Sequence, residues 1–162
     1  MTELIPMRPS TFPAFAEEAI ADYARDSAQA GRWPEQEAPA RARAEFQRLL
    51  PLGLDTPNHF FYEILGGAER APVGSLWFAL DTTDQAKAGY LYSIRVAPPF
   101  RGRGHAKEAL DLLEGVVLDM GLTGMSLHVF SHNTNAQALY RASGYWTTGV
   151  VMRKPLRRPT QE

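Results

Sequence analysis

The sequence predicts an α+β fold with a mixed, mostly antiparallel sheet and about four helices, and three observations lead to it. Apolar residues recur at three- and four-residue steps over the first fifty positions, which is typical of amphipathic helices. From residue 59 onward, short runs rich in aromatic and β-branched residues indicate strands. A long helical stripe then separates two strand-like runs, and this connection implies one parallel strand pair.

Two helices are expected first. Residues 10–31 follow the helical period and end at Gly31, a residue that commonly stops helices. A second helix begins near Pro39 and ends at Pro51. Together these helices occupy about residues 10–50.

Three strands are expected next, at residues 59–65, 73–80 and 90–96, with a polar loop at 81–88. Their short connections imply antiparallel hairpins. The period of two in the third strand puts four residues on one face: Tyr90, Tyr92, Ile94 and Val96.

The second half predicts a helix at residues 101–120, a strand at 125–130 and a short helix at 133–143. A last strand is expected at 146–152, and the tail 153–162 is expected to fray. The length of 162 residues suits one domain covering 1–162.

Composition excludes several classes of function. The formal net charge of −1 gives no overall field that would attract nucleic acid or anionic lipid. Because the chain has no cysteine, disulfides, thiolate zinc sites and cysteine nucleophiles are excluded. The sequence has neither a signal-like N-terminus nor a long apolar run, so we expect a cytoplasmic protein that does not bind membranes.

The segment SIRVAPPFRGRG, which begins at Ser93, combines a strand end with a glycine-rich loop and a helix start. A helix start exposes unpaired N–H groups and a partial positive charge, which suit a phosphate. Gly102 and Gly104 would let a pyrophosphate approach the backbone closely. Three cationic side chains surround the same loop: Arg101, Arg103 and Lys107. The alternative is a glycine turn with solvated charges.

Two other phosphate loops do not match. The dinucleotide pattern G-x-G-x-x-G would need a third glycine where Lys107 stands. The P-loop pattern, with Lys-Ser/Thr after its second glycine, is also missing.

Two motifs together carry a resemblance to a known family. Residues 101–106 read RGRGHA, which resembles the acyl-CoA pyrophosphate loop, Q/R-x-x-G-x-G/A, of the GNAT (GCN5-related N-acetyltransferase) superfamily. About thirty residues later comes a second family pattern, N-x-x-A-x-x-L-Y followed by Gly-aromatic. Here it consists of Asn133, Ala136, Leu139, Tyr140, Gly144 and Tyr145. The resemblance covers residues 73–152 closely and the N-terminal half through its element order.

The resemblance implies an acetyl-CoA-dependent N-acetyltransferase that needs no metal. A primary amine of a small molecule or peptide would attack acetyl-CoA directly in a ternary complex, which agrees with the absence of cysteine. The acetyl-CoA core would be residues 73–152, with the acceptor between the first two helices and the central strands. A homodimer is suggested as well. A catalytically idle acyl-CoA-binding module is the alternative.

The resemblance also implies roles for single residues in binding the cofactor. The strand before the loop would splay at a bulge, so that backbone N–H groups of Ile94, Arg95 and Val96 bind the pantetheine arm and the thioester carbonyl. The pyrophosphate would lie on Arg101, Gly102, Arg103, Gly104, His105, Ala106 and Lys107. Asn133 would hydrogen-bond the pantetheine or order the loop beside it.

Tyr140 stands where the family's general acid hydrogen-bonds the departing sulfur. Many relatives place a glutamate base on the strand before the loop, but this strand has no carboxylate. His128 stands at the position where some relatives have a glutamate on the following strand, and its imidazole suits a base. A hydrogen-bonded sheet histidine is the alternative reading. His132 and Glu63 are reserve candidates, and we expect His128 and His132 to diverge in direction.

The first forty residues hold seven acids and three arginines. This excess favours a cationic acceptor, with a solvated acidic helix face as the alternative.

Overall fold

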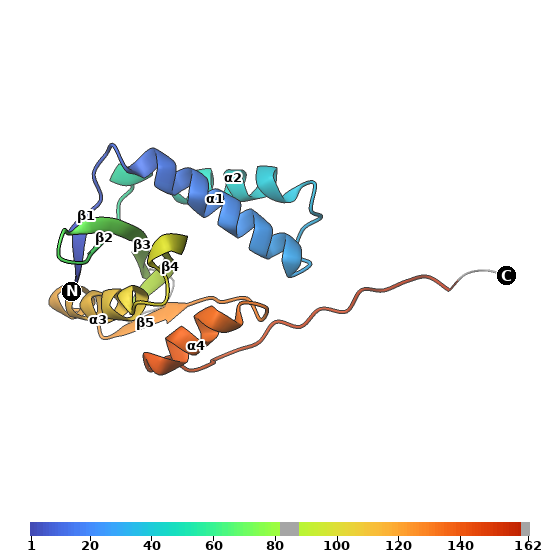
Figure 1. The fold of residues 1–162 in the computed structure, drawn as a ribbon. Coiled ribbons are helices and arrows are strands. Elements are labelled where there is room, and N and C mark those ends of the chain that lie inside the picture. The colour runs from blue at the N-terminus through green and yellow to red at the C-terminus, as the bar shows by residue number, and fades with distance from the viewer. Residues whose placement is uncertain (82–87, 160–162) are drawn as a thin grey trace.

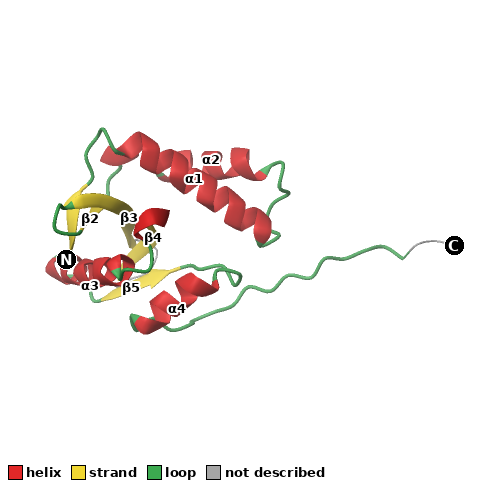
Figure 2. Ribbon diagram, viewed as in Figure 1, coloured by secondary structure: helices red, strands yellow, loops and turns green. Residues whose placement is uncertain are grey.

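The computed structural model describes residues 1–81 and 88–159, and a five-stranded sheet forms its centre (Figures 1 and 2). The strands are β1 (Thr2–Pro6), β2 (His59–Gly66), β3 (Ala71–Asp81), β4 (Ala88–Val96) and β5 (Gly124–Leu127). They lie in the order β1-β2-β3-β4-β5. The first four are antiparallel and the β4–β5 pair is parallel. The predicted mixed sheet with one parallel pair is confirmed.

Within residues 1–81 and 88–159, four α-helices flank the sheet, as expected. They are α1 (Phe12–Gln29), α2 (Ala38–Leu49), α3 (His105–Asp119) and α4 (Thr134–Ala142). In Figure 1, α1 and α2 cover one face of the sheet, while α3 and α4 lie on the other side. Phe61 and Trp77 of the sheet pack toward Phe15 of α1. Leu76 and Leu110 belong to the core between the sheet and α3.

Strand β1 is an element that the sequence analysis missed. It pairs with β2 in antiparallel register and closes one edge of the sheet. A five-residue strand that ends in Pro6 gives little pattern, although proline is tolerated at an edge. The Thr2 hydroxyl ties this edge to α3 through hydrogen bonds with the His105 ring and the Glu108 carboxylate.

A β-bulge at Tyr92 changes the predicted faces of β4. Trp77 lies opposite Ser93 and Phe78 opposite Leu91, so Tyr92 is the extra residue. Beyond the bulge, the alternation of side chains between the two faces of the sheet is reversed. Ile94 packs in the same core as Leu91, whereas Tyr92 stacks on Trp77 of the neighbouring strand, on the opposite face. The expectation that Tyr92 and Ile94 share one face is therefore wrong.

The C-terminal region differs from expectation in two places. β5 ends at Leu127 rather than at residue 130, and residues 146–152 form no strand. Their pattern suits a strand, but within the described residues they meet no partner strand. Residues 153–159 are exposed and irregular, as expected for the tail, and residues 160–162 lie outside the described part. So does most of the predicted polar loop 81–88.

Candidate functional site

The glycine-rich loop and the start of α3 form an open, donor-rich surface. Gly102 and Gly104 have φ values of +73° and +86°, which prevent the helix from starting at residue 101 as predicted. The first helical hydrogen bond runs from Glu108 N to Gly104 O at 3.0 Å, so the amides of residues 105–107 lack intrahelical acceptors. A Cβ built on either glycine would meet no atom within 4 Å.

The cationic side chains of this loop have different roles. The Nε of Arg101 donates to the Val96 carbonyl at 2.8 Å and so fastens the loop to the end of β4. The Arg103 guanidinium lies over the Phe100 ring, 5.9 Å from its centroid. Lys107 is exposed beside Asp111 at 3.3 Å. The His105 ring turns away to Thr2, so His105 and Ala106 can offer an anion their backbone amides.

Beside this loop the parallel strands separate. The pairing of β4 with β5 ends at Leu91 and Leu127, and the Tyr92 bulge follows immediately. The segment from Ile94 to Val96 therefore pairs with β3 but has no partner in β5. Its Arg95 side chain reaches α1, where it lies 3.0 Å from Glu18 and 3.2 Å from Asp22.

Gly74 of β3 supports this geometry from the other side. It lies opposite Val96, and a Cβ at this position would overlap the Arg95 carbonyl. A glycine is therefore required for β3 to approach the last residues of β4, beyond the point where β4 separates from β5.

Helix α4 carries Tyr140 and begins at Asn133. The Asn133 side chain accepts a hydrogen bond from Ala136 N at 3.2 Å, so it caps the helix. Tyr140 packs against the core that α3 forms with the sheet, and its ring lies 5.8 Å from that of Tyr145. Partial burial raises the pKa of Tyr140 to about 12, so its phenol stays protonated at neutral pH.

His128 follows directly after β5 and is exposed. Its ring contacts Phe130 at 4.8 Å, and Phe130 stacks on His132 at 5.6 Å. Both histidine rings therefore contact Phe130, one at its edge and one at its face, and the expectation that the two histidines diverge in direction stays a prediction. Partial burial and the positive charge of Arg32 lower the pKa of His128, which favours the neutral imidazole.

His132 and Glu63 have partners of their own. The Nε2 of His132 lies 3.3 Å from Asp26 of α1. The Glu63 carboxylate is buried and accepts hydrogen bonds from the Nε, Nη2 and backbone N–H of Arg8 and from the Thr11 hydroxyl. These bonds lower the pKa of Glu63, and they hold its oxygens in the core between β2 and α1. This environment indicates a structural carboxylate.

An aromatic wall on β3 and β4 faces the helices α1 and α2. Tyr92 stacks on Trp77 at 4.4 Å and meets the Tyr90 ring at 4.7 Å. The indole N–H of Trp77 donates to Nδ1 of His59 at 3.0 Å. The sequence analysis did not single out Trp77 or His59, and only their strand patterns could have suggested them.

The acidic excess of the N-terminal region is largely neutralised. Six of its seven acidic residues have a partner. Asp26 contacts His132, and the other five form salt bridges with arginines: Glu3, Glu17, Glu18, Asp22 and Glu37. The excess therefore gives little support to a cationic acceptor.

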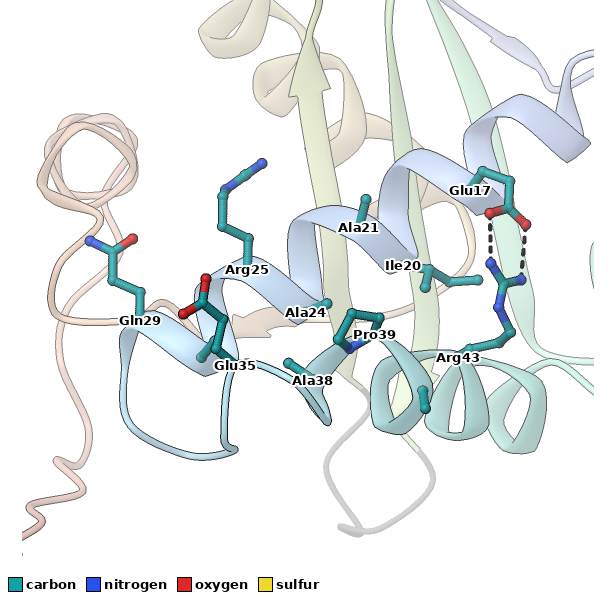
Figure 3. Close-up of a pocket in the computed structure, with 12 residues that line it drawn as sticks. Glu17, Ile20, Ala21, Ala24, Arg25, Gln29, Glu35, Ala38, Pro39 and Arg43 are labelled. Carbon is teal, nitrogen blue, oxygen red and sulfur yellow. Dashed lines mark hydrogen bonds and ion pairs between the residues drawn. The ribbon is translucent and has the colours of Figure 1, made fainter.

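A separate groove of about 920 Å³ lies between α1 and α2 (Figure 3). Small side chains such as Ala24 line it, and the paired Glu17 and Arg43 close one end. None of its lining residues belongs to β4, β5, α3 or α4, so it lies apart from the loop, Tyr140 and His128.

Comparisons with known proteins agree with this geometry. Residues 16–145 match the model of the acetyltransferase (GNAT) family. The chain belongs to this family. It is 35% identical over 153 residues to YycN of Bacillus subtilis, an uncharacterized N-acetyltransferase, covering 94% of this chain and 97% of YycN. YdgE of the same organism, also an uncharacterized N-acetyltransferase, is 34% identical, with 93% and 95% covered.

Solved structures extend the comparison to three dimensions. The crystal structure of YycN superposes with a TM-score of 0.92 at 34% identity, covering 98% of this chain and all of that one. AAC(6')-Iy, solved in complex with the bisubstrate analogue CoA-S-monomethyl-acetylneamine, shares the fold at a TM-score of 0.58 and 18% identity. It covers 98% of this chain and 99% of that one. The chain is therefore an acetyltransferase with the GNAT fold.

The described residues contain neither a membrane-spanning helix nor a cluster of metal-ligand side chains. Among them, no helix combines the length and apolar character needed to cross a bilayer. The same residues contain no group of three or more His, Cys, Asp or Glu side chains suited to a metal ion.

Proposed function

We propose that this acetyltransferase uses acetyl-CoA as its donor and acetylates a primary amine of a small molecule or peptide. The observation that carries the proposal is the separation of β4 from β5 beside the open start of α3. One side of this opening offers backbone groups for an acyl-pantetheine arm. The other offers amides and arginines for a pyrophosphate.

The loop fits the anionic part of the donor. The open space beside Gly102 and Gly104 leaves the backbone accessible, and the amides of residues 105–107 have no intrahelical acceptor. We assign the pyrophosphate to residues 101–107, with His105 acting through its backbone because its ring is bound to Thr2. Ile94, Arg95 and Val96 would bind the pantetheine through backbone groups. Asn133 would act by capping α4 beside them.

The proton transfers are assigned to Tyr140 and His128. The amine loses a proton to the neutral imidazole of His128, directly or through water, and its nitrogen attacks the thioester carbonyl carbon. As the carbon–sulfur bond breaks, the Tyr140 phenol gives its proton to the departing sulfur. The resulting phenolate takes up the second proton that the amine nitrogen loses as the amide forms, which restores the phenol. The protonated state of Tyr140 and the lowered pKa of His128 both suit these roles at neutral pH.

We place the acceptor amine beside the aromatic wall and His128, on the side covered by α1. Tyr90 of the wall lies opposite Ser126 of β5, two residues before His128, so the wall and the proposed base are adjacent. The bisubstrate analogue bound to AAC(6')-Iy, CoA-S-monomethyl-acetylneamine, supports a small-molecule amine as the acceptor. The exposed position of Tyr92 is also compatible with a peptide acceptor. We infer a cytoplasmic enzyme that acts as a homodimer.

The test measures CoA release with a thiol-reactive dye over a panel of primary amines, including aminoglycosides, polyamines and N-terminal peptides. Products are identified by mass, and acetyl-CoA binding is followed by calorimetry. We expect turnover with at least one amine class and a product heavier by one acetyl group. Tight acetyl-CoA binding without transfer to any amine would instead support the idle acyl-CoA-binding module.

A further inference from the structure

The edge strand β1 lies beside α3, the helix whose start is the proposed site of the pyrophosphate (Figure 1). Its first residue, Thr2, is only 7% exposed although its side chain is polar. The Thr2 hydroxyl contacts two residues at the start of α3, His105 and Glu108. A buried hydroxyl with both partners on this turn is placed to control what the turn presents to an anion.

The two hydrogen bonds of Thr2 run in one direction. A hydroxyl carries a single hydrogen, and Thr2 donates it to the Glu108 carboxylate. The contact of 3.0 Å between the Thr2 oxygen and Nδ1 of His105 is therefore donated by the histidine ring. The donors thus run from His105 through Thr2 to Glu108, and Thr2 holds both side chains on the face of α3 that meets β1.

Gly66 of β2 provides the space for this arrangement. It pairs with Thr2 across β1 and β2, and a Cβ at this position would lie 2.5 Å from the His105 ring. The ring therefore occupies a place that a side chain at residue 66 would fill.

The position of Glu108 matters because it is the acidic residue in the first turn of α3. The free amides and partial positive charge of a helix start attract a carboxylate as they attract a phosphate. A Glu108 side chain without the Thr2 bond would compete with a pyrophosphate for that charge and would repel it. The next acid along the helix, Asp111, is already engaged by Lys107 at 3.3 Å.

We propose that Thr2 is a positioning residue for acetyl-CoA, whose hydroxyl keeps the Glu108 carboxylate and the His105 ring against β1 so that the start of α3 stays open to the pyrophosphate. This inference rests on the proposed function, which assigns the pyrophosphate to residues 101–107. Thr2 and Glu108 both lie outside the loop motif, and Thr2 reaches the loop only through the fold.

The first test measures the Kd of acetyl-CoA by isothermal titration calorimetry with the full chain. Thr2→Val removes the hydroxyl and keeps the branched shape, and we expect it to raise the Kd about fivefold, in the range of a carboxylate's effect at a helix start. Thr2→Ser retains the hydroxyl and should bind like the wild type. An unchanged or lower Kd in Thr2→Val would overturn the proposal.

Thr56→Val is the matched control for the loss of a buried hydroxyl. Thr56 is 8% exposed, and its hydroxyl donates to the Gly53 carbonyl at 2.8 Å, in a turn that contributes nothing to the loop. Its Kd should equal that of the wild type. A rise equal to that of Thr2→Val would assign the effect to a general loss of stability, against the proposal.

The second test asks whether the charge of Glu108 causes the effect. The double variant Thr2→Val/Glu108→Gln should return the Kd to near the wild-type value, because the released side chain is then neutral. A double variant that binds as weakly as Thr2→Val alone would contradict the proposal.

An exposed position decides the matter if Thr2→Val does not fold. Glu108→Asp keeps the charge but is one methylene too short for the Thr2 hydroxyl, so it should raise the Kd about fivefold as well. Glu108→Gln removes the charge and should not raise it. Equal Kd values for the two variants would overturn the proposal.

The third test separates positioning from a general loosening of the site. S-acetylpantetheine lacks the pyrophosphate, so it should raise the Tm of the wild type and of Thr2→Val equally. Acetyl-CoA should raise the Tm of Thr2→Val less than that of the wild type. A Thr2→Val protein that loses its response to both compounds alike would show that the hydroxyl acts on the whole site, and the proposal would be wrong.

The outcomes for the wild type distinguish the two proposals. A wild-type protein that does not bind acetyl-CoA would contradict the proposed function and this inference together. A wild type that binds acetyl-CoA, with a Thr2→Val variant that binds it equally well, would contradict this inference alone.

Discussion

The guanidinium of Arg101 donates from Nε to the Val96 carbonyl oxygen at 2.8 Å, and this bond joins the glycine-rich loop to the last residue of β4. It connects the two parts of the proposed cofactor site, the loop for the pyrophosphate and the strand for the pantetheine. Arg101 therefore acts as a positioning residue as well as a source of positive charge.

Replacing Arg101 should weaken acetyl-CoA binding through the loss of this connection. We expect Arg101→Ala to raise the Kd about tenfold, equivalent to about 1.4 kcal/mol, by isothermal titration calorimetry. Arg101→Lys retains the charge but not the planar guanidinium, so it should bind acetyl-CoA nearly as weakly as the alanine variant does. If Arg101→Lys binds like wild type, charge alone explains the effect and the positioning role is excluded.

Tyr140→Phe tests the general acid. Removing the hydroxyl keeps the ring in the core, so the protein should fold and bind acetyl-CoA with an unchanged Kd. The chemical step should slow by about 10²-fold or more, the usual range for acid catalysis. Tyr145→Phe is the control, because its ring lies 5.8 Å from Tyr140 and has no proposed part in the reaction. A variant that loses acetyl-CoA affinity but keeps its single-turnover rate would contradict the role.

His128→Ala tests the general base. We expect kcat to fall about 10²-fold or more, and the acidic limb of the pH–rate profile to disappear. An unchanged profile would transfer the role to another group, with His132 as the first candidate because it already contacts Asp26.

The pH dependence of the wild type follows from the lowered pKa of His128. A base works only when unprotonated, so activity should fall as pH drops through that pKa, and the limb in kcat/KM should lie below the ordinary histidine value of about 6.5. Arg32→Gln removes the positive charge that helps to lower this pKa, and it should move the limb to higher pH. Arg25→Gln, at an exposed salt bridge with Asp22, should leave the limb in place. A limb that Arg32→Gln does not move would rule out this electrostatic effect.

Much of the fold could be predicted because its signals are local. Three features can be recognised from a few neighbouring residues each: the apolar stripe of α3, the glycines at 102 and 104, and the pattern at 133–145. The bulge at Tyr92 could not be predicted in this way, because it depends on the register with β3. The strand expected at 146–152 has a local pattern too, but its formation depends on a partner strand.

The same distinction holds within the candidate site. The motif placed Tyr140 on α4 without knowledge of its neighbours. The positive charge of Arg32 lowers the pKa of His128 although the two residues are nearly one hundred positions apart, and no local sequence pattern indicates this effect. The partners of Glu63 are also remote, since Arg8 and Thr11 precede α1. Sequence reasoning could therefore name Glu63 as a possible base but could not see that its carboxylate is occupied.

Glu63 gives the last prediction, which concerns stability. The carboxylate pKa is lowered in the folded protein, so its stabilising contribution is present above the unfolded value of about 4.3 and is lost as pH falls through the folded pKa. Glu63→Gln should lower the free energy of unfolding by about 2 kcal/mol at pH 7, measured in urea, and by much less in acid. Its kcat should stay near that of wild type, because the carboxylate is structural.

The control for Glu63 is Glu17→Gln, which breaks an exposed pair with Arg43. Because solvent and salt screen such exposed pairs, they contribute little to stability, and this variant should unfold almost as the wild type does at both pH values. If Glu63→Gln is no less stable than Glu17→Gln, the buried bonds to Arg8 and Thr11 do not stabilise the fold. If it is stable but loses acetyl transfer with its acidic limb, Glu63 rather than His128 is the base.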